Sequence, residues 1–420
     1  MKITHINPAP HGITRRAGLL TLLGSALAIA GCGGGGDGGI AAVGAGGTGS
    51  FSVGPIRGFG SIIVNGVRFD DDGAKVRNDD DDDNIFSRSR SELKLGMMVA
   101  VIGSSVTGSR ATANNIVFGS ELVGPISATT ANPQTLTVLG QTVEITGSTI
   151  FDATSLSGGF ASLVPGNIVE VHGVVNQVTN SIQATLIEKK RSASVYKIQG
   201  LVKNLNSGSS TFTLGTGATA IKVSYLGTSD VRVALDNDVS VRVRLQPVSP
   251  APEVWTATRI RPPENHATVS RGEVEIEAEI EGSVTAFTSD TQFSVNGIPV
   301  TTSSTTRFDD VTTGLAVGVR VEVKGRLRGG VLIAERVKIE DDNDVDELEF
   351  ELHGTVSNVT PTTFTLTSSG GVAVNVSYSS ALITGLINGS SRVVEVKGTA
   401  SDATITSTVI VATSIKFETN

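Results

Sequence analysis

Residues 291–301, Thr-Gln-Phe-Ser-Val-Asn-Gly-Ile-Pro-Val-Thr, contain the pattern that decides the fold. Apolar Phe293 and Val295 alternate with polar neighbours, which is the two-residue period of a half-buried strand. Asn296-Gly297 follows, and this dipeptide favours the positive φ angles of a two-residue hairpin turn. The stretch therefore predicts a β-hairpin.

Outward from this hairpin, three landmarks recur along the 420-residue chain. A glycine opens each unit, a segment of the type Gly318 to Gly325 (Gly-Val-Arg-Val-Glu-Val-Lys-Gly) follows, and an alanine three residues before a branched apolar residue closes it. The opening glycines are Gly54, Gly124, Gly200, Gly282 and Gly354. Self-similarity at a period of roughly seventy residues indicates tandem repeats. The third repeat departs at Asp238 to Leu245, which lacks both glycines of the second landmark.

Each repeat is expected to form about five or six short strands, since no segment beyond the N-terminal region has a helical period. A sheet this small avoids exposed edges best by closing on itself. We therefore predict an all-β fold of five tandem small β-barrels that are OB-like, with a β-sandwich as the alternative. We expect each repeat to have a core of its own. The predicted repeats span residues 51–119, 120–190, 194–263, 273–340 and 347–419.

The N-terminal region reads as an export segment. Residues 17–30 are apolar but too short for a permanent membrane helix, and Arg15-Arg16 precedes them. The segment ends in Ile29-Ala30-Gly31-Cys32, which resembles a bacterial lipobox in which the thiol of Cys32 receives the lipid. We predict a lipoprotein signal peptide over 1–31. Both the general secretory route and the twin-arginine route stay open.

A flexible glycine-rich tether is predicted over residues 32–50, because the segment has no apolar periodicity. The expected location is the bacterial cell envelope. The lipid on Cys32 would anchor the protein in a membrane, with the outer membrane expected, facing the periplasm or the cell surface. Cys32 is the single cysteine, so no disulfide can form.

The repeats resemble the bacterial family called domain of unknown function 5666. The likeness rests on the Gly-Pro-Ile opening, the Phe-x-Val-Asn-Gly turn, the segments Thr306 to Asp309 and Thr149 to Asp152, and the Gly-x-x-Val-x-Val-x-Gly strand. It extends over nearly all of residues 51–419 and is weakest in the third repeat. The resemblance implies a lipoprotein with a glycine run after the lipidated cysteine, and it implies no catalytic residues.

Composition argues against several classes of function. A net charge of −8 and 4% aromatic residues disfavour nucleic-acid binding, which depends on basic clusters and stacking platforms. The five histidines share no spacing typical of a metal site, so His172 and His353 are expected at the surface or at strand edges. Neither a nucleophile elbow nor a phosphate loop is present. We therefore expect no enzyme activity and no required cofactor.

Two acidic runs are the candidates for a cation site, and calcium is the ion considered because carboxylate oxygens suit it. The spacing of every second residue is shown by Asp79, Asp81 and Asp83, and again by Asp342, Asp344 and Asp346. Neither run fits an EF-hand, since its sixth position lacks glycine and its twelfth lacks glutamate. A solvated acidic loop is the competing interpretation.

The third repeat is basic where its neighbours are acidic. Residues 194–262 contain eight Lys and Arg against four Asp and Glu, so 8 − 4 leaves +4. Docking against an acidic neighbour is one interpretation, and a solvated basic face is the other. The leading functional hypothesis is a non-enzymatic binding or structural module with an unidentified envelope protein or glycan partner. The alternative is an envelope enzyme, or its accessory subunit, with a site formed between repeats. A polar pocket with shifted pKa values would favour that alternative.

Overall fold

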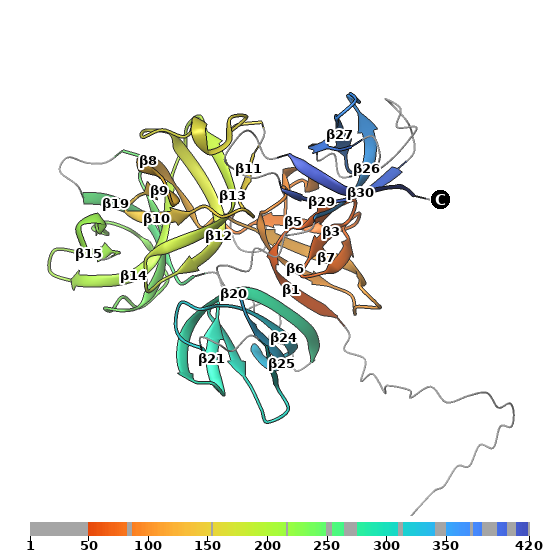
Figure 1. Cartoon of the computed structure of the whole chain (residues 1–420). Helices are drawn as coiled ribbons and strands as arrows, with labels where there is room; N and C mark the ends of the chain where they lie inside the picture. The colour runs from red at the N-terminus through yellow and green to blue at the C-terminus, as the bar shows by residue number, and fades with distance from the viewer. Residues whose placement is uncertain are drawn as a thin grey trace, which may run out of the picture. The chain divides into compact units, whose positions relative to one another are not determined.

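The computed structural model describes residues 49–81, 86–152, 154–215, 217–248, 254–263, 275–309, 314–340, 350–369, 373–379, 393–400 and 409–418. In these ranges the chain consists of strands, turns and three short 3-10 segments, Arg90–Glu92, Gly159–Ser162 and Gly217–Thr219, with no α-helix (Figure 1). The all-β prediction is confirmed. No helix long and apolar enough to cross a membrane occurs in this part of the chain.

The first repeat shows how a barrel closes. Its strands are β1 (Ser50–Pro55), β2 (Gly58–Phe59), β3 (Ile62–Val64), β4 (Val67–Asp70), β5 (Lys75–Asn78), β6 (Met98–Gly103) and β7 (Arg110–Phe118). Antiparallel ladders join β2 to β3, β3 to β4, β6 to β7 and β1 to β6, while β4 and β5 lie parallel to β7. The paired strands run from β1 through β6, β7, β4 and β3 to β2. Because β2 follows β1 almost directly in the chain, this series closes on itself. This strand order is that of an OB-like barrel.

The same order recurs in the rest of the described chain. The second repeat contains β8 (Leu122–Ala131), β9 (Gln134–Val138), β10 (Gln141–Glu144), β11 (Ile150–Phe151), β12 (Ile168–Asn176) and β13 (Ser181–Lys190). The third contains β14 (Tyr196–Asn206), β15 (Thr211–Leu214), β16 (Ile221–Ser224), β17 (Asp230–Val231), β18 (Ser240–Leu245) and β19 (Val254–Arg261).

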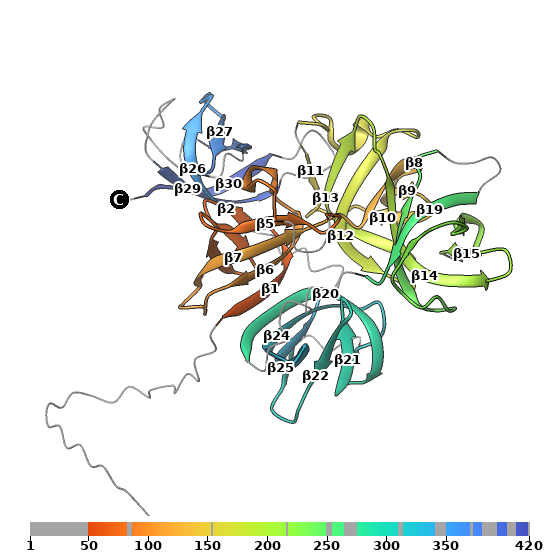
Figure 2. The same ribbon diagram turned by 180° about the vertical axis from the view of Figure 1, so that it is seen from behind.

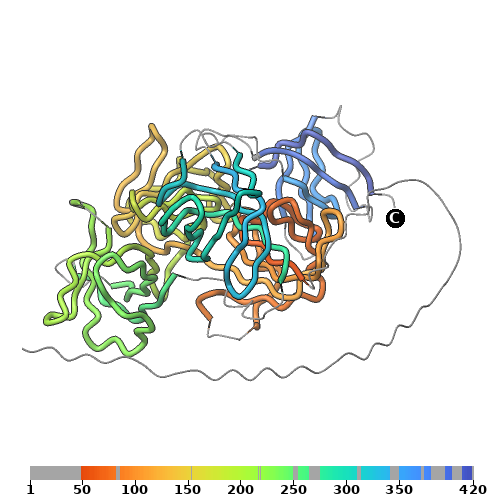
Figure 3. The backbone as a smooth tube through the Cα atoms, turned by 90° about the horizontal axis from the view of Figure 1, so that it is seen from below, coloured from red at the N-terminus to blue at the C-terminus, as the bar shows by residue number. Residues whose placement is uncertain are grey.

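The fourth repeat contains β20 (Ile276–Ser289), β21 (Gln292–Val295), β22 (Ile298–Thr301), β23 (Arg307–Asp309), β24 (Arg320–Arg328) and β25 (Val331–Ile339). The fifth contains β26 (Phe350–Ser357), β27 (Thr363–Thr367), β28 (Ala373–Ser377), β29 (Val393–Ala400) and β30 (Ile410–Phe417). Figure 2 shows β20, β21, β22, β24 and β25 wrapped into one barrel, and Figure 3 traces the backbone. The OB-like prediction is confirmed, and the repeat boundaries stay predictions.

The predicted hairpin explains why a glycine opens the fourth repeat. Val295 pairs with Ile298, and Asn296 and Gly297 take φ angles of 49° and 76° between them. The side chain of Asn296 folds back onto β20, where its Nδ2 donates to the carbonyl of Glu281 at 3.1 Å. A Cβ on Gly282 would collide with that side chain. The opening glycine therefore makes room for the turn asparagine.

The second landmark is a turn followed by a bulge, and the third repeat keeps both without glycine. Gly318 has φ +90°, and the ladder between β24 and β25 shifts register between Lys324 and Gly325. In the third repeat Asp238 adopts φ 66°, a left-handed conformation that aspartate tolerates better than most residues. The register shift is also kept there, at Arg244 and Leu245.

The prediction that each repeat has a core of its own is wrong. One cluster of buried apolar residues joins the second and third repeats, and another joins the first and fifth. Phe51 and Val53 of β1 belong to the cluster of the fourth repeat. The reason is strand pairing across repeats, since β1 lies parallel to β20 and β2 lies parallel to β26.

Candidate binding site between the repeats

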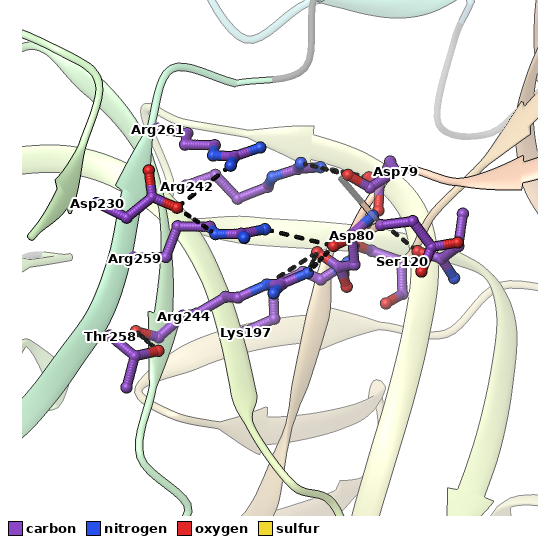
Figure 4. Close-up of polar contacts among 12 residues, drawn as sticks. Asp79, Asp80, Ser120, Lys197, Asp230, Arg242, Arg244, Thr258, Arg259 and Arg261 are labelled. Atoms are coloured by element: carbon purple, nitrogen blue, oxygen red, sulfur yellow. Dashed lines mark hydrogen bonds and ion pairs between the residues drawn. The ribbon is translucent and has the colours of Figure 1, made fainter. Parts of the chain in front are cut away.

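The acidic turn after β5 docks onto the basic strands of the third repeat. Asp79 is 5% exposed, and its Oδ1 lies 3.3 Å from Lys197 Nζ. Its other oxygen accepts from Arg242. Asp80 Oδ2 lies 2.7 Å from Lys197 Nζ, and Arg244 lies 3.0 Å from Asp80 Oδ1 (Figure 4). Basic residues of the third repeat thus form ion pairs with Asp79 and Asp80, which lie in a turn of the first repeat.

Strand register places these cations on one face. Lys197 on β14 lies opposite Arg244 on β18, and Gln199 lies opposite Arg242. Their neighbours Ile198 and Val243 point into the core, so the alternation of a strand turns the charged residues outward. The acidic turn covers this outer face, which is why Lys197 is only 1% exposed.

Backbone carbonyls and a second carboxylate complete the cluster. Lys197 Nζ donates to the carbonyl of Ser120 at 2.8 Å, and Arg259 donates to the carbonyl of Asp80 at 3.3 Å. Asp230 lies 2.7 Å from Arg259 and 3.2 Å from Arg261, which holds both guanidinium groups in place (Figure 4). The guanidinium group of Arg259 is thus held by Asp230 of the third repeat and by the Asp80 carbonyl of the first repeat.

Charges in the cluster reinforce one another. Burial raises the pKa of the Asp80 carboxyl, but the positive charges of Lys197 and Arg244 outweigh it and hold that pKa well below its usual range. Burial lowers the pKa of Lys197, but Asp79 and Asp80 raise it above its usual value. Asp80 and Lys197 are therefore both charged near neutral pH.

A cavity of about 320 Å³ adjoins this cluster. Its wall carries the charged side chains of Asp79, Glu121 and Arg242 beside apolar groups such as Val53 and Val174. Amide and hydroxyl side chains supply further polar groups, namely those of Gln177, Gln199, Ser240, Thr285, Ser294 and Asn296. These lining residues come from the first four repeats, so the cavity exists only because the repeats pack together.

Glu121 gives the cavity its most unusual electrostatic feature. Burial raises the pKa of its carboxyl to about 7, and the nearby charge of Asp79 adds to the effect, while Lys197 and Arg242 oppose it. The chain holds the residue in place through its backbone N–H, which donates to the carbonyl of Val171 at 2.9 Å. At neutral pH this carboxyl is therefore close to half protonated and can donate as well as accept a hydrogen bond.

The first acidic run is engaged with cations of the chain itself. Asp79 pairs with Lys197 and Arg242, and Asp81 lies 2.7 Å from Arg88. The structure therefore gives both carboxylates a role in ion pairs, and calcium binding there stays a prediction. Cys32, Asp83, Asp342, Asp344 and Asp346 lie outside the described residues.

Two groups of ligand-type side chains lie close enough together to hold a metal ion in the described part of the chain. The first is Asp70, Asp71 and Asp72, where Arg90 lies 3.4 Å from Asp71 and 2.7 Å from Asp72. The second is Glu351, His353 and Glu395. In both groups the ligand atoms lie within 4.8 Å of one another.

Sequence reasoning counted the basic residues of the third repeat but missed Glu121. The residue stands alone at the start of an ordinary strand, and nothing in its neighbours predicts burial. Its environment comes from Asp79 and Arg242, which are distant in sequence. Glu121 lies three residues before the opening Gly124, and no local signal in the sequence marks it.

The fold and this site define a tandem-repeat protein of OB-like barrels with a polar cavity between them. The sequence model described as "Domain of unknown function (DUF5666)" matches residues 123–188 and 281–338, which confirms the resemblance to that family. These segments correspond to most of the second and fourth repeats. No curated protein matches the chain.

Among solved structures, the chain is similar to a Drosophila structure titled "drosophila Unr CSD456", at 14% identity over 54% of this chain and 98% of that one, with a TM-score of 0.13. It is also similar to a Streptococcus pneumoniae multidomain protein "with nucleic acid binding domains", at 10% identity over 52% of this chain and 71% of that one, with a TM-score of 0.15. At these scores neither likeness supports a functional conclusion.

Proposed function

We propose that this protein is a non-enzymatic binding module of the bacterial cell envelope, anchored through a lipid on Cys32, whose inter-repeat cavity binds a neutral, hydroxyl-rich ligand of saccharide type. The observation that carries the proposal is the cavity itself. Its volume of about 320 Å³ lies at the lower end of the roughly 300–1,000 Å³ range of small-molecule sites. A ligand of one or two sugar rings suits that size.

The chemistry of the wall supports a neutral ligand. Asp79 and Arg242 neutralise each other within the chain, and Glu121 is neutral once it is protonated. The remaining polar groups are amides and hydroxyls, which pair with sugar hydroxyls as donors and as acceptors. Apolar lining groups such as Val174 can contact the C–H faces of a ring.

The test is saturation-transfer NMR on the mature protein with a panel of neutral mono- and disaccharides, together with charged analogues. Gln177→Ala removes a lining amide whose Nε2 donates to Ser240 Oγ at 2.8 Å. We expect saccharide binding that this variant weakens at least tenfold. Gln246→Ala, at an exposed position outside the cavity, is the matched control and should bind like wild type. Lack of binding to every neutral saccharide at millimolar concentration would contradict the proposal.

An envelope enzyme is the second candidate, and one observation favours it. A carboxyl with a pKa of about 7 inside a cavity is a group of the kind that serves as a general acid or base. Incubating the protein with the saccharide it binds separates the two functions. A binding module returns the ligand unchanged, whereas an enzyme releases product at a rate that Glu121→Gln abolishes.

A further inference from the structure

One pair of facing positions decides what the outer face of each barrel presents. It consists of the residue before the opening glycine and the residue opposite it on the strand that carries the second landmark, namely β6, β12, β18, β24 or β29. The five pairs are Val53 with Ala100, Val123 with Glu170, Gln199 with Arg242, Glu281 with Glu322, and His353 with Glu395. The chemistry of the pair differs from repeat to repeat, and the fifth repeat alone places an imidazole opposite a carboxylate.

His353 is buried although it points away from the core of its own barrel. Its neighbours Phe350 and Leu352 belong to the core cluster, while His353 lies on the outer face and is only 3% exposed. A Cβ on Gly60 of the first repeat would collide with the Cβ of His353, and Arg68 of the same repeat lies 3.1 Å from the ring nitrogen Nε2, so the first repeat packs against His353. The prediction of a surface or strand-edge histidine is therefore wrong for this residue, and it is also wrong for His172, which is buried.

Carboxylates gather around this imidazole. Glu351 Oε1 lies 2.8 Å from His353 Nε2, and Glu418 Oε1 contacts Nδ1. Glu395 brings a third carboxylate, with ligand atoms of Glu351, His353 and Glu395 all within 4.8 Å of one another. Glu351 is about one-third exposed, so an ion can reach the group from solvent.

Two contacts at Nε2 require opposite protonation states of the ring. Nε2 is 2.8 Å from a carboxylate oxygen of Glu351, which only accepts, and 3.1 Å from Nη1 of Arg68, which only donates. A protonated Nε2 opposes Arg68, and an unprotonated Nε2 opposes Glu351. A metal ion bound between Nε2 and Glu351 satisfies both ligand atoms, provided that the flexible side chain of Arg68 moves aside.

We propose that Glu351, His353 and Glu395 bind a divalent transition-metal ion, for which zinc fits the mixed nitrogen and oxygen donors, and that Glu418 positions the imidazole. Zinc binds His nitrogen and carboxylate oxygen at about 2.0–2.2 Å and commonly takes three protein ligands with one open position. Glu418 accepts from Nδ1–H and so presents the lone pair of Nε2, the usual arrangement of a histidine ligand.

The charge of the group suits a cation. Three carboxylates, Glu351, Glu395 and Glu418, surround His353, whereas the cationic side chains placed against the group are Lys397, 3.1 Å from Glu351, and Arg68. No ion pair involving Glu395 is recorded among the described residues. Glu351, His353, Glu395 and Glu418 all belong to the fifth repeat, and the site does not use the cavity described above.

The test is isothermal titration of zinc chloride into chelator-treated mature protein. We expect one saturable site, weakened at least a hundredfold by Glu395→Gln and by His353→Gln. Glu418→Gln should weaken it by about 10–100-fold, the usual effect of losing a carboxylate that orients a histidine ligand. Glu322→Gln is the matched control, because Glu322 holds the same register position in the fourth repeat, and it should bind zinc like wild type.

Cobalt gives a second readout that does not depend on heat. Bound Co²⁺ should show the intense visible absorption of a four-coordinate site, and Glu395→Gln should remove it even if His353→Gln fails to fold. Calcium and magnesium, which prefer all-oxygen sites, should not displace zinc. No saturable zinc binding to wild type, or unchanged binding in Glu395→Gln, would overturn the proposal.

Discussion

Lys197 Nζ lies 3.3 Å from Asp79 Oδ1, and both side chains are almost completely buried, at 1% and 6% exposed. The two residues belong to the third and first repeats, so this ion pair ties together segments that are far apart in the sequence. It also borders the cavity through Asp79. Removing one partner of such a pair leaves the other buried charge with less compensation, although Arg242 still pairs with Asp79 and Asp80 still pairs with Lys197.

Lys197→Met should therefore lower the free energy of unfolding by about 1–3 kcal/mol, less than the loss of an isolated buried pair would cost, because Arg242 still pairs with Asp79 and Arg244 with Asp80. Asp79→Asn should act similarly, and the double variant should lose less than the sum of the two, because the second change removes the stranded charge. Urea unfolding followed through Trp255, the single tryptophan, measures this. Lys203→Met, which breaks a solvent-exposed pair with Asp238, is the control and should change stability by about 1 kcal/mol or less. Additive effects would contradict the coupling.

Glu121 should make stability fall as the pH rises. Burial raises the pKa of its carboxyl in the folded protein to about 7 from its ordinary 4.5, so the folded state retains a proton that the unfolded state loses. Stability from this residue is full below the ordinary pKa and falls between about pH 4.5 and 7, with a total change on the order of 3 kcal/mol.

The measurement compares wild type with Glu121→Gln in urea at several pH values. The variant should be the more stable protein at pH 8, and the difference should shrink toward pH 5. Glu335→Gln, at a side chain that is 61% exposed, is the control and should keep the wild-type profile. A Glu121→Gln variant with that same profile would argue against the raised pKa.

Local sequence patterns predicted the barrels because their causes are local. Alternation fixes which residues of β21 face inward, and Asn296-Gly297 fixes the turn that joins β21 to β22. The third repeat was the weakest match to the pattern, yet Asp238 adopts a positive φ as Gly96, Gly166 and Gly318 do in the first, second and fourth repeats. Backbone geometry thus persists where residue identity changes.

Contacts between repeats could not be predicted in the same way. Nothing near Asp79 indicates that Lys197 will neutralise it, and nothing near His353 indicates that Gly60 will cover it. These contacts depend on strand pairing between repeats, such as β1 with β20 and β2 with β26, which leaves no periodic signal. The candidate sites lie at these contacts. The sequence therefore showed which charged residues are present, but it did not show which residues of other repeats they contact.

Nucleic-acid binding should be absent at physiological salt. The basic face of the third repeat is covered, since Lys197, Arg242 and Arg244 pair with Asp79 and Asp80. Fluorescence polarisation with labelled single- and double-stranded oligonucleotides should show no saturable binding up to about 10 µM at 0.15 M salt. The double variant Asp79→Asn with Asp80→Asn frees these cations and should bind weakly and in a salt-dependent way. Tight binding by wild type would contradict the expectation.

Cys32 should determine membrane association. Cys32→Ser removes the thiol that receives the lipid, so the protein should accumulate as an unprocessed precursor or appear in the soluble fraction. Cell fractionation with metabolic lipid labelling measures both outcomes. Ser25→Ala, within the signal region, is the control and should leave processing intact. Mature-sized protein that stays in membranes after Cys32→Ser would rule out the lipid anchor.

The most direct test of the proposed function closes the cavity without disturbing the core. Ala286 lines the cavity and is itself exposed, so Ala286→Trp should fill the cavity mouth while the melting temperature stays at the wild-type value. Ala131→Trp, at an exposed strand end away from the cavity, is the control. Isothermal titration with the neutral saccharide that binds wild type should give the wild-type affinity for Ala131→Trp and no measurable binding for Ala286→Trp. Equal binding by both variants would place the ligand elsewhere and contradict the account.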